Sequence, residues 1–113
     1  QINQIASDAF DVIFMELGAQ LEKARKDGLP TLACGHVNIL GSVASTGQPQ
    51  IGAELEISEA HLARLGDCQK LFNHIHKHQR SGSAIYAGSL CRLDWGETEE
   101  KGFLLIEMEQ EAA

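Results

Sequence analysis

The chain lacks long apolar runs. None of its hydrophobic stretches reaches the roughly 18 residues of a membrane-spanning helix, and no signal peptide is recognisable. Its cysteines, Cys34, Cys68 and Cys91, are odd in number and contain no Cys-x-x-Cys pair, which indicates neither a zinc ribbon nor a disulfide framework. We therefore expect a soluble, cytoplasmic protein without membrane contact, in which the three thiols are buried and reduced.

Basic residues are also scarce. Lys and Arg number 9 against 16 Asp and Glu, and the formal net charge is −7. The acidic excess is present in both halves of the chain. A free-standing nucleic-acid binder held by phosphate contacts would show a basic face, and the composition argues against that class. The acidic composition is compatible with an enzyme that binds nucleic acid through metal ions or through another part of the molecule.

The length of 113 residues, with 43% hydrophobic and 22% charged residues, fits one small globular domain. Because the first residue is Gln1 and not Met, we expect the chain to be a portion of a longer protein. Within residues 1–29 the pattern predicts one amphipathic helix over residues 9–26, capped by Ser7 or Asp8. Apolar residues at i, i+3, i+4 spacing define its buried face: Phe10, Ile13, Phe14, Leu17, Leu21 and Ala24.

After the first helix the pattern changes to short apolar runs between turn formers, which is typical of buried strands. Residues 51–57 form either a short strand or the approach to a second helix, which Ser58 caps and which runs to about Leu65. We place His61 of that helix at the surface and expect Trp95 to be a packing residue. The remaining predicted elements are three strands, over residues 31–34, 83–87 and 102–108, and a long exposed loop over residues 41–52.

The segment 67–79 is ambiguous from its own residues. As a strand, residues 68–72 would end in a loop that carries histidines. As a helix, His74 and His78 would share one face at i,i+4, as two ligands of a single zinc do.

This histidine-rich run is the most informative feature of the chain. It places His74, His76 and His78 within five residues, and His36 follows the apolar run at 31–34. Neutral imidazole binds zinc, manganese, iron and similar ions, and side chains at i and i+2 of an extended segment point to the same side. Divalent-metal sites usually include carboxylates, and no Asp or Glu lies close to the run in sequence. The run therefore supplies only part of a metal site.

Four motifs follow one another between residues 30 and 109. They are the Leu-Ala-Cys-Gly-His-Val segment around His36, the His-Ile-His-Lys segment His74–Lys77, the Gly88-Ser89 pair after a strand, and the Arg-x-Asp-x-x-Glu pattern of Arg92–Glu97. This ordered series resembles the calcineurin-like metallophosphoesterases, and within them the DNA-repair exonucleases of the SbcD type. A departure from the family is Asn73, where the family has glycine. Asparagine tolerates a left-handed turn better than most residues do.

The resemblance implies that residues 1–113 are the C-terminal portion of one metallophosphoesterase domain. The implied fold class is α/β, the C-terminal half of a four-layer α/β/β/α sandwich with a mixed sheet. Two divalent metal ions are implied, manganese first, with zinc, iron or magnesium as alternatives. His36 and His74 would ligate one metal, and His76 would ligate the other. Because the family's motif lies beyond the end of a strand, the resemblance favours strand-then-loop for 67–79.

The implied activity is hydrolysis of phosphodiester bonds in a DNA substrate. The implied partners are an SMC-like ATPase subunit, a second copy in a homodimer, and the N-terminal half of the domain itself. The family's carboxylates and acid/base histidine lie in that half, so no catalytic or substrate-binding residue is assigned and the chain alone is expected to be inactive. Two alternatives stay open: a small-molecule phosphatase or phosphodiesterase of the same superfamily, and a non-catalytic scaffold that has lost the metal site.

Overall fold

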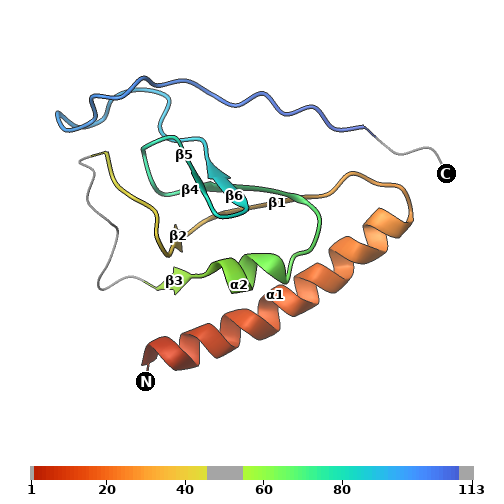
Figure 1. Cartoon of the computed structure of the whole chain (residues 1–113). Coiled ribbons are helices and arrows are strands. Elements are labelled where there is room, and N and C mark those ends of the chain that lie inside the picture. The colour runs from red at the N-terminus through yellow and green to blue at the C-terminus, as the bar shows by residue number, and fades with distance from the viewer. Residues whose placement is uncertain (1, 46–54, 110–113) are drawn as a thin grey trace.

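The computed structural model describes residues 2–45 and 55–109, and this part of the chain is mixed α/β (Figure 1). The predicted α/β class and the mixed sheet are confirmed. In chain order the described elements are α1 (Ile2–Lys26), β1 (Leu32–His36), β2 (Asn38–Ile39), β3 (Glu56–Ile57), α2 (Glu59–Ala63), β4 (Gln69–Asn73), β5 (Gln79–Ser81) and β6 (Ala84–Tyr86).

Four strands form the main sheet in the order β1-β4-β6-β5. β1, β4 and β6 run parallel, and β5 runs antiparallel to β6. β2 and β3 pair with each other in a separate parallel ladder. Because β1 and β4 are parallel neighbours, their carboxyl ends meet at the same end of the sheet. His36 is the last residue of β1, and His74 directly follows β4.

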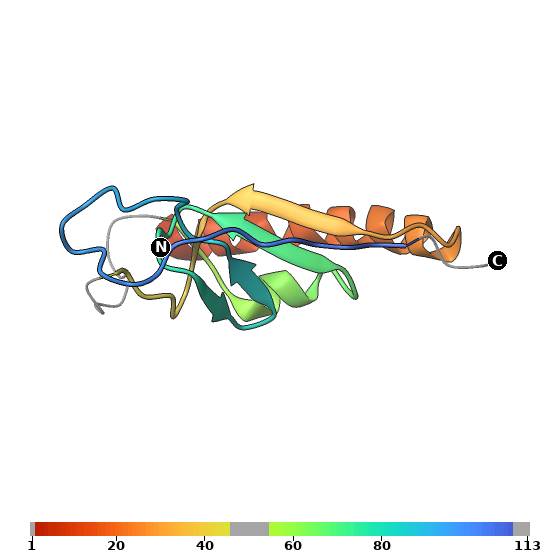
Figure 2. The same cartoon turned by 90° about the horizontal axis from the view of Figure 1, so that it is seen from above.

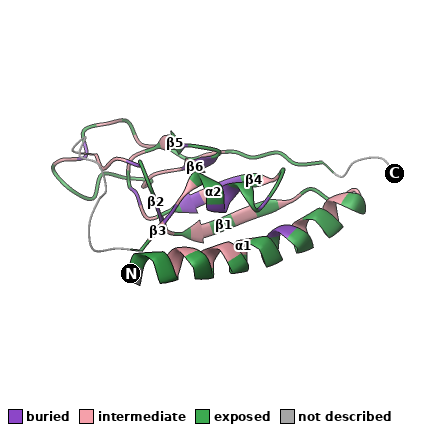
Figure 3. Cartoon of the chain, turned by 60° about the horizontal axis from the view of Figure 1, so that its bottom comes forward, coloured by how far each residue is buried: buried purple, intermediate pink, exposed green. Residues whose placement is uncertain are grey.

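Both helices cover one face of the main sheet. Phe72 of β4 and Tyr86 of β6 are buried together with Leu62 of α2, and Phe10 and Phe14 of α1 pack against this cluster. Figure 3 shows the buried residues gathered between the sheet and the helices. Burying one large apolar side chain contributes about 1.5–3 kcal/mol, so this face carries most of the stability. The buried apolar residues of the core are Ile39, Ile57, Leu62, Leu65, Phe72, Ile75, Ala84 and Tyr86.

Tyr86 also connects the main sheet to the β2–β3 ladder. Its hydroxyl donates to the carbonyl oxygen of Val37 at 2.6 Å and accepts from the N–H of Ile39 at 2.8 Å. The side chain is fully buried, and burial raises the pKa of the phenol. The hydroxyl therefore stays protonated and keeps both hydrogen bonds over the physiological pH range.

The opposite face of the main sheet, here called the open face, is covered by neither described helix. On β1, Leu32 and Cys34 are exposed. The register sets Cys34 beside Leu71, and Leu71 beside Ile85, and the last two side chains are only half-buried. The chain is a thin slab, and its smallest principal extent of 16 Å runs across the strands of the main sheet (Figure 2). This open face presents a row of apolar side chains to its surroundings.

The first helix is longer than predicted. It begins at Ile2 instead of Ala9, so Ser7 and Asp8 lie inside it and neither caps it. The sequence places no proline or glycine in this first stretch, and the helix continues through it. Its predicted end is confirmed, because Gly28 follows the last turn with φ +77° and accommodates the left-handed exit from the helix.

The buried face of α1 is also shifted from the predicted one. Phe10, Phe14 and Leu21 contact the core as expected, but Ile13 and Leu17 are 50% and 43% exposed. Gly18 takes the most buried position instead, because the backbone of α2's last turn lies against it. A Cβ at Gly18 would lie 1.9 Å from a carbonyl oxygen of that turn. Hydrophobic periodicity does not predict this contact, because it depends on the absence of a side chain at Gly18.

The segment 67–79 adopts the strand-then-loop arrangement, as β4 followed by a loop over residues 74–78. β1 and β6 confirm two more predicted strands. The strand expected over 102–108 is wrong: this segment pairs with no other described strand, and Phe103 and Leu105 are each 80% exposed. The strand β5 was not predicted. Part of the loop expected over 41–52 lies outside the described residues, and its described portion includes the buried Ser42.

All three cysteines are free, but the prediction that they are buried is wrong for two of them. Cys34 is exposed on the open face of β1, and Cys91 is exposed in the loop after β6. Cys68 is partly buried, and its burial raises the pKa of the thiol. Neither helix in the described part of the chain meets the length and hydropathy that crossing a bilayer would need.

Candidate metal centre

His36 and His74 meet at the carboxyl ends of two adjacent parallel strands. His36 is the last residue of β1 and lies opposite Asn73, the last residue of β4, so His74 emerges beside it. Nε2 of His36 and Nδ1 of His74 are 3.2 Å apart, and the ring centroids are 5.0 Å apart at 69°. The fold thus brings together two imidazoles that are 38 positions apart in sequence.

The spacing of these two nitrogens fits a shared cation. Two ligands on a tetrahedral ion with bonds of about 2.1 Å lie roughly 3.4 Å apart, and two on an octahedral ion lie roughly 3.0 Å apart. The observed 3.2 Å lies between these values. It equally fits a hydrogen bond from one ring to the other. Among residues 2–45 and 55–109, no group of three or more His, Cys, Asp or Glu side chains is arranged to hold an ion, so the pair is at most part of a ligand set.

The backbone at His74 has an unusual conformation. Its φ is +116°, and it is the one residue other than glycine with positive φ in the described part of the chain. Asn73 belongs to β4, so the left-handed role expected for it is wrong and falls to the next residue. A side chain held in such a region costs about 1–3 kcal/mol and persists only where the surroundings enforce it. The conformation turns the chain out of β4 and brings the imidazole toward His36.

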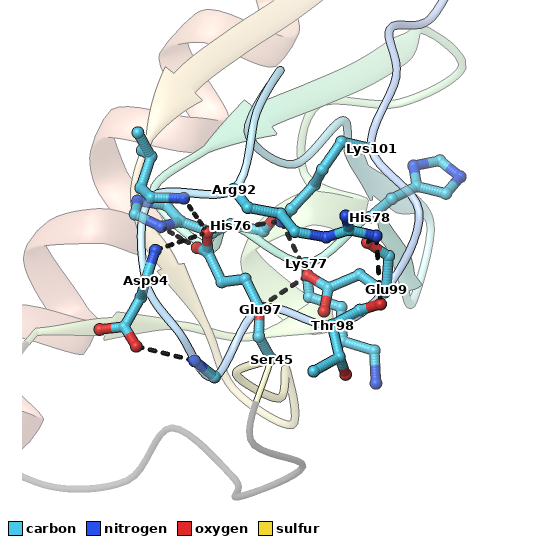
Figure 4. Close-up of polar contacts among 12 residues, drawn as sticks. Ser45, His76, Lys77, His78, Arg92, Asp94, Glu97, Thr98, Glu99 and Lys101 are labelled. Atoms are coloured by element: carbon cyan, nitrogen blue, oxygen red, sulfur yellow. Dashed lines mark hydrogen bonds and ion pairs between the residues drawn. The ribbon is translucent and has the colours of Figure 1, made fainter.

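His76 does not join this pair in one ligand group. Its Nδ1 lies 2.5 Å from Oε1 of Glu97 (Figure 4). The glutamate side chain is only 4% exposed, whereas the imidazole is 49% exposed. The ring is therefore held at its Nδ1 edge by a buried carboxylate, while much of its surface faces outward.

The Glu97 carboxylate is itself anchored by backbone. Its Oε2 accepts hydrogen bonds from the N–H groups of Leu93 and Asp94, the latter at 3.2 Å. The Leu93 N–H holds the pKa of Glu97 below its ordinary value, and His76 and Lys101 add to this effect. The group is thus an ionised acceptor at neutral pH.

The main chain of the histidine loop is fixed by the Gly88-Ser89 motif. The Ser89 N–H donates to the carbonyl oxygen of His76 at 2.9 Å, and Lys101 Nζ donates to the same oxygen at 2.8 Å. Gly88 has φ +84°, and a Cβ there would lie 2.6 Å from that oxygen and 2.8 Å from the backbone nitrogen of His78. Only glycine permits this approach.

Lys101 also holds a second carboxylate. Its Nζ lies 2.7 Å from Oε1 of Glu99, which accepts in addition from the Ser45 hydroxyl at 2.7 Å. These two contacts, the Lys101 contact foremost, lower the pKa of Glu99 to about 2. Figure 4 shows that these contacts of Glu97, Glu99 and Lys101 hold the C-terminal segment next to the histidine loop. Sequence reasoning assigned no role to Glu97, Glu99 or Lys101, because their contacts with His76 and Ser45 join residues that are distant in sequence.

His61 is buried, so its predicted surface position is wrong. Its Nδ1 accepts from the Ser58 N–H at 3.0 Å, and its own N–H donates to Ser58 Oγ at 3.4 Å, which completes a capping box. α1 covers the ring: Nε2 lies 3.0 Å from the carbonyl oxygen of Ser7, and the rings of Phe10 and Phe14 lie 5.9 and 6.0 Å away. His61 therefore serves the fold.

Trp95 is fully exposed, at 101%, so the packing role expected for it is wrong. It lies in a turn that the side chain and the carbonyl oxygen of Asp94 hold closed. Asp94 Oδ1 accepts from the Gly96 N–H at 2.9 Å, and the Glu97 N–H donates to the Asp94 carbonyl at 3.1 Å. Arg92 supports the same loop by donating to the carbonyl of Glu99 at 3.2 Å.

Comparison of the chain with protein-family models, with curated proteins and with solved structures finds no match. The roles of His36, His74 and His76 as metal ligands stay predictions.

Proposed function

We propose that this chain is part of a metal-dependent phosphoesterase that hydrolyses phosphodiester bonds, with DNA as its substrate. The observation that carries the proposal is the approach of His36 and His74 to 3.2 Å at the ends of adjacent parallel strands. A strained main chain at His74 supports it, because strain of this kind clusters at functional sites. The motif order resembling SbcD-type exonucleases supplies the reaction class.

In this proposal His36 and His74 would hold one divalent ion, manganese first, and His76 would hold a second. Such ions would supply Lewis-acid chemistry, because bound divalent cations lower the pKa of water and offset negative charge on a phosphodiester. The imidazoles contribute as neutral ligands and leave the positive charge of the site largely intact. Carboxylate ligands and the acid/base group come from the N-terminal half of the same domain.

The open face of the main sheet supports this completion by a second half. Leu32, Leu71 and Ile85 lie on that face without helices over them, whereas the other face is buried by α1 and α2. Apolar sheet faces are normally covered by another layer. A second sheet and its helices stacked on this face give the proposed four-layer α/β/β/α sandwich. An SMC-like ATPase and a second copy of the protein are partners proposed from the resemblance alone.

A non-catalytic scaffold that has lost the metal site is the second candidate. The observation that favours it is Asn73, which stands where the family has glycine. A small-molecule phosphoesterase of the same superfamily is a third reading, which differs only in substrate.

The test is hydrolysis by the full-length protein in the presence of Mn²⁺. Linear duplex DNA and bis-p-nitrophenyl phosphate are supplied in parallel, with the variants His36→Ala, His74→Ala and His78→Ala. His78 is the matched control, because it is an exposed imidazole of the same loop whose Nδ1 donates to the Tyr86 carbonyl at 3.0 Å.

The proposal expects both substrates to be cleaved, at least a 100-fold loss in the first two variants, and near-normal rates in the control, since loss of a ligand disables metal chemistry. Cleavage of the small diester alone would indicate the small-molecule phosphoesterase. No Mn²⁺-dependent hydrolysis of either substrate would indicate the scaffold.

A further inference from the structure

The contact between His76 and Glu97 fixes which nitrogen of the imidazole carries the proton. An ionised carboxylate only accepts hydrogen bonds, so at 2.5 Å from Oε1 the Nδ1 of a neutral His76 must be the protonated nitrogen. The other nitrogen, Nε2, then has a free lone pair. None of the described residues makes a hydrogen bond to it, and the ring is 49% exposed. The structure therefore leaves Nε2 as the one ligand atom of this ring.

We propose that Glu97 is a positioning residue for His76, which it holds as the Nδ1–H tautomer so that Nε2 binds a divalent cation. This inference rests on the proposed function, since it deepens the role of one ligand in that site. A histidine ligand commonly donates its other N–H to a carboxylate, which fixes the ring and raises its basicity. Here the donor, the acceptor and the burial of the acceptor are all present.

The two carboxylate oxygens of Glu97 have different partners. One oxygen, Oε2, is occupied by the N–H groups of Leu93 and Asp94, and the other, Oε1, is left for His76. A residue that served only to close the turn would need Oε2 alone. The turn residues thus orient the carboxylate, and the carboxylate orients the imidazole.

This division of the two oxygens makes Glu97→Gln an informative variant. Glutamine has nearly the same shape but only one acceptor oxygen. The two backbone N–H groups of the turn require that oxygen, so the amide NH₂ must face Nδ1 of His76. Nδ1 then becomes the acceptor and Nε2 takes the proton, which removes the lone pair that would bind metal. The variant should fold and yet present the wrong tautomer.

The test has two readouts, both made on the full-length protein. The first is the tautomer of His76 in the metal-free protein, from ¹⁵N NMR of histidine-labelled samples at about pH 8, where an ordinary imidazole is neutral. The second is the affinity for Mn²⁺, measured by calorimetry. Glu99→Gln is the matched control, because Glu99 contacts Ser45 and Lys101 and makes no described contact with His76.

The inference expects Nδ1–H in the wild type and in the control, and Nε2–H in Glu97→Gln. It expects Mn²⁺ affinity to fall about 10–100-fold in Glu97→Gln alone, the usual effect of losing an outer partner of a ligand. An unchanged tautomer in Glu97→Gln, or a changed tautomer with unchanged affinity, overturns it. A wild type that binds Mn²⁺ with the expected tautomer but cleaves no phosphodiester supports the inference and overturns the proposed function.

Discussion

The backbone conformation of His74 leads to a prediction about stability that does not depend on metal binding. Two variants, His74→Gly and His74→Ala, both remove the imidazole and its contact with His36. They differ in how they bear a φ of +116°, which alanine adopts only with strain and glycine adopts freely. Relief of about 1–3 kcal/mol, less about 0.5 kcal/mol for the greater freedom of glycine in the unfolded chain, leaves roughly 0.5–2.5 kcal/mol. The glycine variant should be the more stable by that amount.

The assay is urea unfolding of the full-length protein, with midpoints compared at equal slope. Asn73 provides the matched control, because it is a regular strand residue at the end of β4. There, Asn73→Gly should be less stable than Asn73→Ala by about 0.5–1 kcal/mol, since glycine weakens a strand. If His74→Gly were no more stable than His74→Ala, the strain at His74 would be absent. If Asn73→Gly were the stabilising change, the turn would lie one residue earlier than described.

Two further predictions concern stability. Tyr86→Phe should lower the free energy of unfolding in urea by about 1–3 kcal/mol, because the buried hydroxyl's hydrogen bonds of 2.6 and 2.8 Å to the backbone around β2 are lost; an unchanged midpoint would contradict this. Glu99, whose pKa is lowered from 4.5 to about 2 by Lys101 and Ser45, favours the folded state above pH 4.5, and this contribution should disappear as pH falls from about 4.5 to 2. Stability measured against pH should therefore drop less steeply over that range in Glu99→Gln, and an identical profile would show that the contacts of Glu99 do not form.

The elements that local pattern could predict are those whose signals lie in a few adjacent residues. The helix signal in α1, the apolar run of β1 and the Ser58 cap of α2 are of this kind, and all three are present. β4 required more, because residues 67–79 fit a helix or a strand equally well by their own pattern. The family resemblance, through its motif order, favoured the strand that the structure contains.

The features that local pattern missed depend on tertiary contacts. β5 exists because β6 pairs with it, and the exposed segment 102–109 stays unpaired although its composition suits a strand. His61 is buried because α1 lies across a helix of only five residues. The contact between Glu97 and His76 is also tertiary, since 21 positions separate the two residues. The sequence therefore indicated the candidate histidines but not that a buried Glu97 holds His76.

The most direct test of the account is an anomalous difference map from crystals of the full-length protein grown with Mn²⁺. The account predicts one peak at about 2.1 Å from both His36 Nε2 and His74 Nδ1, and a second at a similar distance from His76 Nε2. A map without a peak at these nitrogens, with His36 and His74 hydrogen-bonded to each other at the metal concentration used, would contradict it.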